Sequence, residues 1–281
     1  MLGLLLITLA TRPVPGPGVS LELARHRART ISDVRYDIRL AIPESADPVT
    51  GTVTVRFHLR IREPVVLDFR APGANVQTVR DAHGNAVTPI LTEDHITIPA
   101  AALIAGENEV TLDFTATDAA LNRRGDYLYA LFVPDRASTA FPCFDQPDLK
   151  SRYRLRLSIP AAWRAVANGG LESVDSAATT KQLAFHETAP ISTYLFTFAA
   201  GKLFVEEAER DGRHFTMYHR ETDSAKVARN REAIFDLPDL FGDVDVDGPV
   251  AGQGDNRCKS GRRDGAQAVR GDADDGGFQR G

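Results

Sequence analysis

Apolar and polar residues alternate with a period of two along much of the chain between residues 33 and 201. In the first two such segments every second residue is apolar: Val34, Tyr36, Ile38, Leu40 and Ile42, and then Val53, Val55, Phe57, Leu59 and Ile61. This period is typical of strands that bury one face. Between these segments, residues 43–51 (PESADPVTG) are rich in turn-forming residues, so the pair predicts a hairpin with a long loop.

The same kind of pattern returns at short intervals further along the chain. Additional strands are predicted at residues 64–69, 75–79, 95–99, 108–116, 152–160, 181–187 and 192–201. Gly, Pro and Asn residues lie between many of them and favour turns. Many short strands joined in this way predict an all-β fold, in the form of a twisted antiparallel β-sandwich or a saddle-shaped sheet assembly.

The pattern changes after residue 218. Residues 222–237 have few β-branched residues and apolar positions at roughly helical spacing, and Thr222 or Asp223 can act as the N-cap. These features predict one helix. Residues 238–281 are rich in Gly, Asp and Arg and contain few large apolar residues. A disordered tail is expected there, because such a segment cannot bury enough surface to offset the entropy of ordering it.

Composition excludes some classes of function. The chain has 281 residues, 43% of them hydrophobic, which is enough for a substantial core, and its formal net charge is −5. A negative balance gives no reason to expect nucleic acid as a partner, because phosphate binding requires a positive surface. The basic run at residues 24–30 (ARHRART) is interpreted as a solvated face with no assigned role.

The first twenty residues combine an apolar core at residues 2–10 with a Pro/Gly-rich linker. The core is too short to span a membrane and suits a signal peptide, although the basic residues that usually precede such a core are missing. If it is a signal peptide, the protein is periplasmic or secreted; otherwise it is cytoplasmic. With only Cys143 and Cys258, a disulfide framework is excluded, so cysteine usage does not decide between these locations.

One loop before a predicted strand combines unusual residue types. It contains Phe141, Pro142, Cys143, Phe144, Asp145, Gln146 and Pro147. The prolines fix the backbone, the phenylalanines can bury large surfaces and Asp145 can cap backbone N–H groups. Cys143 is interpreted as a small buried residue, because no activating His stands in a partner pattern nearby. The loop is therefore predicted to be structural rather than catalytic.

This loop resembles the F-P-C-F-D-E-P signature of the M1 family of zinc aminopeptidases, with Gln146 where the signature has Glu. Residues 189–203 (APISTYLFTFAAGKL) resemble a late strand of the same domain, and the similarity extends from about residue 31 to 237. The resemblance implies an aminopeptidase N-like chain, with a signal peptide and linker at 1–20 and an N-terminal β domain at 21–220. Residues 221–237 would be the first helix of a catalytic domain.

In this family the N-terminal domain also contributes side chains to the substrate cleft, from a T-Q-x-E stretch about ten residues before the signature. The corresponding positions here are residues 130–133, Ala-Leu-Phe-Val, so neither the Gln nor the Glu is present. Direct substrate contact by these polar groups is therefore in doubt. Leu131 or Phe132 could still line a pocket for a hydrophobic substrate side chain.

The catalytic motifs of the family do not occur in the chain. Zinc binding and water activation need H-E-x-x-H on a helix, where two His share one face and the Glu acts as general base. His186 is followed by Glu187, but the position four after His186 is Pro190. The family's G-x-M-E-N motif, which binds the free amine of the substrate, is also absent.

These absences predict that the chain is inactive by itself, with no catalytic residue and no metal ligand of its own. Zinc and a peptide substrate would belong to the complete parent enzyme, which removes N-terminal amino acids from peptides, and its catalytic domain would pack on this domain. We expect a chain truncated near residues 237–239, with the tail read out of frame. The alternative is a stand-alone, non-catalytic β-sandwich that binds peptides or proteins along its strand edges.

Overall fold

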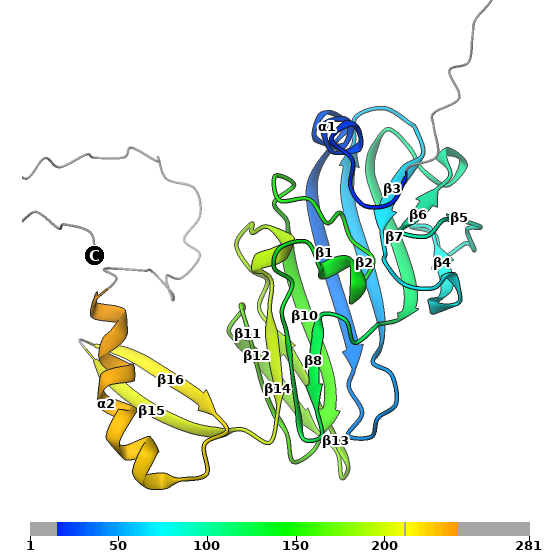
Figure 1. Ribbon diagram of the computed structural model, residues 1–281. Helices are drawn as coiled ribbons and strands as arrows, with labels where there is room; N and C mark the ends of the chain where they lie inside the picture. Colours follow the sequence, from blue (N-terminus) through cyan, green and yellow to red (C-terminus); the bar gives the residue numbers. More distant parts are fainter. Residues whose placement is uncertain (1–15, 211, 241–281) are drawn as a thin grey trace, which may run out of the picture. The chain divides into compact units, whose positions relative to one another are not determined.

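The computed structural model describes residues 16–210 and 212–240 (Figure 1). The apolar segment interpreted as a signal peptide and nearly all of the predicted tail lie outside these residues. Within them, none of the helices is long and apolar enough to cross a membrane.

Two α-helices and a series of mostly short strands make up the described chain. The helices are α1 (Leu21–Thr30) and α2 (Ser224–Leu240), with short 3₁₀ turns at η1 (Gly73–Asn75), η2 (Ala100–Ala102), η3 (Ala137–Thr139) and η4 (Thr193–Leu195). The strands are β1 (Ile31–Ala41), β2 (Thr50–Leu59), β3 (Val65–Asp68), β4 (Val76–Arg80), β5 (Ile90–Leu91), β6 (His95–Ile98), β7 (Gly106–Thr115), β8 (Leu121–Arg124), β9 (Tyr127–Ala130), β10 (Arg152–Pro160), β11 (Arg164–Ala167), β12 (Leu171–Ser176), β13 (Thr180–Phe185), β14 (Phe198–Gly201), β15 (Phe204–Arg210) and β16 (Arg213–His219). This content confirms the predicted all-β fold class.

A seven-stranded sheet carries most of the predicted strands, in the order β12-β13-β10-β1-β2-β7-β4. The predicted hairpin is confirmed, because β1 and β2 pair antiparallel with Ile38 opposite Val53. One pair departs from the antiparallel expectation: β1 and β10 run parallel, with Tyr36 beside Tyr153. The long stretch of chain between β1 and β10 permits this arrangement, because parallel neighbours need a long crossover connection.

Three smaller sheets complete the described fold. Their strand orders are β11-β14-β9-β8, β3-β6-β5 and β15-β16. Strands β5, β8, β9, β11, β12, β15 and β16 have no counterpart among the predicted segments. All six residues of β12 are exposed, so that edge strand buries no apolar face from which alternation could predict it.

Phe196 is at the centre of the aromatic packing between two of these sheets. Its ring stacks on Tyr153 of β10 with the centroids 4.5 Å apart, and it also packs on Phe132, Phe141 and Phe198 of β14. The predicted strand at 192–201 is correspondingly shorter than expected. The 3₁₀ turn η4 replaces its first part, with Phe196 N–H donating to the Thr193 carbonyl at 3.1 Å.

Helix α1 was not predicted, and it corrects the interpretation of the basic run as a solvated face. Ser20 caps the helix by accepting a hydrogen bond from the Leu23 N–H at 3.1 Å. Arg25 and Arg29 are exposed as expected, but Arg27 is 1% exposed. Figure 1 shows α1 at the end of the seven-stranded sheet, beside β3.

Helix α2 confirms the predicted helix near residues 222–237. Asp223 precedes its first turn and its Oδ1 accepts hydrogen bonds from the N–H groups of Ala225 and Lys226, at 2.9 and 3.3 Å. Contacts divide the chain into residues 1–232 and 233–281. The first unit contains all the sheets, and the described part of the second is the last part of α2.

Candidate functional site

The Phe141–Pro147 loop connects η3 to the chain that enters β10, and it is attached to the end of β3. The Asp68 N–H donates to the Cys143 carbonyl at 2.7 Å, and the Cys143 N–H donates to the Asp68 carbonyl at 3.1 Å. This two-bond bridge makes the loop an extension of the small sheet that contains β3. The position of the loop is therefore determined by strand pairing as well as by its prolines.

The two phenylalanines of the loop are buried in the core, as the sequence predicts. Phe141 contacts the edge of Tyr36 with ring centroids 6.0 Å apart, and Phe144 contacts Phe57 in the same way at 5.9 Å. The Phe144 N–H also donates to the Tyr36 hydroxyl at 2.8 Å. Such edge-to-face pairs each add about 0.5–1.5 kcal/mol beyond simple burial.

Asp68, at the end of β3, is the centre of a buried polar cluster. Its carboxylate accepts two hydrogen bonds from Arg27, Nη1 to Oδ2 at 2.8 Å and Nη2 to Oδ1 at 2.6 Å. It also accepts the Asp145 N–H at 2.8 Å and faces Nδ1 of His95 at 3.0 Å. The cluster joins α1, β3, β6 and the Phe141–Pro147 loop, so it fixes elements that are far apart in sequence.

In this cluster, neighbouring charges and hydrogen bonds shift the pKa values of Asp68 and His95 in opposite directions. Burial alone would raise the pKa of Asp68, but the Arg27 charge and the hydrogen bonds from His95, Arg27 and the Asp145 amide lower it below its ordinary value. For His95, burial opposes protonation, and the bond and charge of Asp68 outweigh it and raise the pKa. His95 Nε2 faces the carbonyl oxygens of Gly16 and Gly18 at 3.0 and 3.1 Å. Both ring nitrogens therefore face acceptors, and this arrangement suits the imidazolium form.

Asp145 performs the capping role that the sequence predicts. Its Oδ2 accepts the Ser138 N–H at 3.0 Å and its Oδ1 accepts the Thr193 hydroxyl at 2.9 Å. Burial raises the pKa of this carboxyl above its ordinary value despite these bonds. Asp145 thus connects the loop to η3 and η4.

Cys143 is a buried core residue, as the sequence predicts. Its side chain is fully buried, and burial together with the Asp145 and Asp68 charges raises the pKa of its thiol well above the ordinary value. A thiol in this state is a poor nucleophile, because the thiolate is the reactive form.

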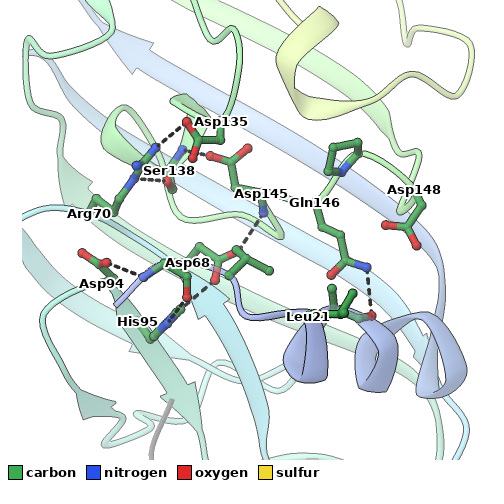
Figure 2. Close-up of a pocket in the computed structure, with 14 residues that line it drawn as sticks. Leu21, Asp68, Arg70, Asp94, His95, Asp135, Ser138, Asp145, Gln146 and Asp148 are labelled. Atoms are coloured by element: carbon green, nitrogen blue, oxygen red, sulfur yellow. Dashed lines mark hydrogen bonds and ion pairs between the residues drawn. The ribbon is translucent and has the colours of Figure 1, made fainter. Parts of the chain in front are cut away.

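A pocket of about 380 Å³ opens beside the Asp68 cluster (Figure 2). Its wall includes residues of α1, of the ends of β3 and β6, and of the Phe141–Pro147 loop. The polar side chains in its wall are Asp68, Arg70, Asp94, His95, Asp135, Ser138, Asp145, Gln146 and Asp148. The sequence placed Asp145 and Gln146 in one motif, but only folding brings them beside Asp94 and α1.

Leu131 and Phe132 have different surroundings. Leu131 is 44% exposed, whereas Phe132 is 1% exposed and packs on Phe141 and Phe196. Only Leu131 of this pair presents its side chain at the surface. Alternate residues Tyr129, Leu131 and Val133 are all exposed and form what we call the β9 apolar patch.

No group of three or more His, Cys, Asp and Glu side chains in the described part of the chain is arranged to hold a metal ion. His186 and Glu187, the one His-Glu pair in the sequence, lie just after β13, and His186 is exposed. These residues do not fit a zinc site.

Comparison with known protein families identifies the domain to which this loop and its surrounding strands belong. Residues 32–195, more than half of the chain, match the peptidase M1 N-terminal domain family. The chain belongs to the M1 peptidase family. The matched region contains nearly all of the β1–β2 hairpin, the Phe141–Pro147 loop, and Asp68 and His95 of the buried cluster, whereas Arg27 of α1 lies before it. The structural motif identified in the sequence therefore lies inside the family's N-terminal domain.

Individual M1 relatives match parts of the chain. Glutamyl aminopeptidase of Rattus norvegicus is 32% identical over 109 residues, which are 37% of this chain and 12% of the relative. Aminopeptidase N of Streptomyces lividans is 30% identical over 171 residues, 55% of this chain and 19% of the relative. The chain thus spans less than a fifth of the length of either enzyme.

Solved structures of an M1 zinc metallopeptidase from Deinococcus radiodurans have the same fold. One aligns with a TM-score of 0.57 and 21% sequence identity, covering 76% of this chain and 54% of the metallopeptidase. A second, bound to a Tyr-Ser-Ala substrate, aligns with a TM-score of 0.56 and 22% identity, covering 72% and 53%. At these identities the likeness establishes the fold of an M1 N-terminal β domain.

Proposed function

We propose that this chain provides the non-catalytic N-terminal β domain of a zinc-dependent aminopeptidase and does not hydrolyse peptides by itself. The observation that supports this proposal most directly is the Phe141–Pro147 loop, whose side chains are engaged in the core and in the Asp68 cluster. They are not arranged around a reacting centre. The parent reaction would be hydrolytic release of N-terminal amino acids, with zinc and the general base supplied by a catalytic domain.

The β9 apolar patch is the surface that we assign to that catalytic domain. Tyr129, Leu131 and Val133 are 42%, 44% and 51% exposed, and Leu195 of η4 is 50% exposed. Tyr129 lies in β9, Leu131 follows its end and Val133 lies in the next turn. Large apolar side chains exposed so close together favour a protein interface. The family's substrate-contacting stretch corresponds to residues 130–133, which supports a position next to the cleft.

Two measurements test the proposal. Purified chain supplied with zinc should release no 4-nitroaniline from leucine 4-nitroanilide above the buffer rate. In size-exclusion chromatography, the chain should co-elute with the catalytic domain of the Streptomyces lividans aminopeptidase N expressed without its own N-terminal domain. Measurable zinc-dependent hydrolysis by the chain alone would overturn the proposed lack of activity.

A matched pair of variants makes the second measurement specific. Leu131→Asp places a charge in the β9 apolar patch and should abolish co-elution. Val174→Asp places the same charge at an equally exposed apolar position, 48% exposed on the edge strand β12, and should leave co-elution unchanged. Equal loss in both variants, or a failure of the unmodified chain to co-elute, would favour the alternative of a stand-alone binding module.

A further inference from the structure

The pocket beside the Asp68 cluster has an excess of negative charge. Five aspartates line it, Asp68, Asp94, Asp135, Asp145 and Asp148, against the two cationic side chains Arg70 and His95. Asp68 is compensated by Arg27 and His95, and Asp135 lies 3.7 Å from Nη2 of Arg70. Asp94, Asp145 and Asp148 therefore form no ion pair with a cation among the described residues, and Asp145 is already engaged by Ser138 and Thr193, so Asp94 and Asp148 supply the charge that is open to a ligand.

Asp94 and Asp148 differ in the hydrogen bonds that their carboxylates already accept. Asp94 accepts the Gly18 N–H through Oδ2 at 2.6 Å, which leaves Oδ1 available. Asp148 is exposed, and among the described residues its carboxylate makes no hydrogen bond or ion pair. Both carboxylates can thus turn an oxygen to a bound cation without breaking the contacts that hold the fold.

An independent feature of the same pocket is an unpaired acceptor. Gln146 is 2% exposed, and its Nε2 donates to the Ala24 carbonyl of α1 at 3.0 Å. Its Oε1 is buried and has no hydrogen-bond partner within the described chain. Figure 2 shows the Gln146 amide among the side chains that line the pocket, with its nitrogen facing α1. An unsatisfied buried acceptor costs about 1–3 kcal/mol, and a bound donor removes that cost.

We propose that this pocket binds a small organic cation that carries N–H donors, of the primary ammonium class. The Asp148 and Asp94 carboxylates supply the opposing charge, and the ammonium donates to Gln146 Oε1, which is buried in this structure, once the Gln146 side chain turns toward the pocket. Val19, Leu21 and Pro147 provide apolar wall for a short alkyl chain. The volume of about 380 Å³ is at the lower end of the range of roughly 300–1,000 Å³ that is typical of small-molecule sites.

The inference is independent of the proposed aminopeptidase function, because it uses only residues 18–148 and no catalytic domain. The probe is n-butylammonium chloride, titrated into the ¹⁵N-labelled full chain and followed by two-dimensional NMR. The neutral n-butanol and the anionic butyrate have the same alkyl body and are titrated at the same ionic strength. We expect saturable shifts of the Gln146 side-chain amide with n-butylammonium, at a Kd on the order of 1 mM for so small a ligand.

Variants separate specific binding from general attraction to an acidic protein. Asp148→Asn should weaken n-butylammonium binding roughly threefold, as expected for a partly solvated charge pair. Gln146→Met, which keeps the side-chain length and removes the acceptor, should weaken it about tenfold. Glu172→Gln removes the same charge from the exposed strand β12 and should leave the Kd unchanged.

The proposal is overturned if n-butanol or butyrate produces the same shifts at equal concentration, or if n-butylammonium produces none. It is equally overturned if Asp148→Asn and Glu172→Gln change the Kd alike. The Gln146→Met variant also loses the bond to Ala24 and can fail to fold. The comparison of the three probes and the Asp148→Asn variant then decide the result by themselves.

Discussion

Arg27 of α1 and Asp68 of β3 form a buried, two-bond ion pair in which the side chains are 1% and 3% exposed. The Arg27 guanidinium also lies over the Phe144 ring, 5.4 Å from its centroid. One side chain from a short helix therefore contacts both the end of a strand and the M1 signature loop. This arrangement makes α1 part of the core architecture.

Replacing Arg27 should destabilise the fold strongly. Arg27→Met keeps an unbranched apolar side chain but leaves the Asp68 carboxylate buried without its main counter-charge. Breaking a buried ion pair in this way typically costs about 3–5 kcal/mol. Urea unfolding followed by tryptophan fluorescence measures the change, since Trp163 is fully buried. Arg25→Met, in the exposed part of the same helix, should alter the free energy of unfolding by less than about 0.5 kcal/mol. Equal effects of the two substitutions would contradict this role of the pair.

Stability should fall as pH rises through the folded-state pKa of His95. Since this pKa is raised in the folded protein, protonation of His95 favours the folded state. The contribution is fully present below the unfolded value of about 6.5 and disappears as pH increases through the folded pKa. The free energy of unfolding, measured at intervals from pH 5 to 9, should therefore decrease in this window.

His95→Gln should remove that decrease, because the substituted side chain does not titrate. His186→Gln serves as the control, since His186 is exposed and should leave the pH profile unchanged. A profile that keeps its full slope in His95→Gln would show that another group is responsible.

Cys143 should resist alkylation in the folded protein. Its thiol is fully buried and its pKa is raised, so both access and thiolate formation are suppressed. Native protein treated with iodoacetamide at pH 8 should give an unmodified Cys143 peptide by mass spectrometry. The same treatment in guanidinium chloride should modify it fully. Rapid labelling without denaturant would contradict the proposed burial of the loop.

Phe196→Ala should cost about 3–5 kcal/mol, because it leaves a cavity at the centre of the aromatic cluster. The neighbouring rings come from β10, β14 and the segment around Phe132 and Phe141, so the cavity cannot collapse without moving several elements. Thermal unfolding by calorimetry measures the loss. Phe204→Ala removes an aromatic residue that is 51% exposed and should change stability far less. Comparable losses would mean that Phe196 does not hold the sheets together.

The alternation of apolar residues was sufficient to predict the main strands, the β1–β2 hairpin and the all-β class. Val53, Val55, Phe57 and Leu59 are each at most 1% exposed, as a period of two requires of the buried face. Elements without a buried apolar face could not be predicted from this alternation. Strand β12 is exposed at every position, and α1 buries a charged residue where a pattern of apolar residues would be expected.

The sequence by itself also determined the structural character of the Phe141–Pro147 loop, because prolines restrict the backbone and large aromatic side chains favour burial whatever their partners are. Only the tertiary structure decided which distant side chains complete it. Arg27, Asp68 and His95 are separated by 41 and 27 positions along the chain, and no local pattern links them. They meet because strand pairing and the docking of α1 place them together, and burial then makes each charge depend on the others.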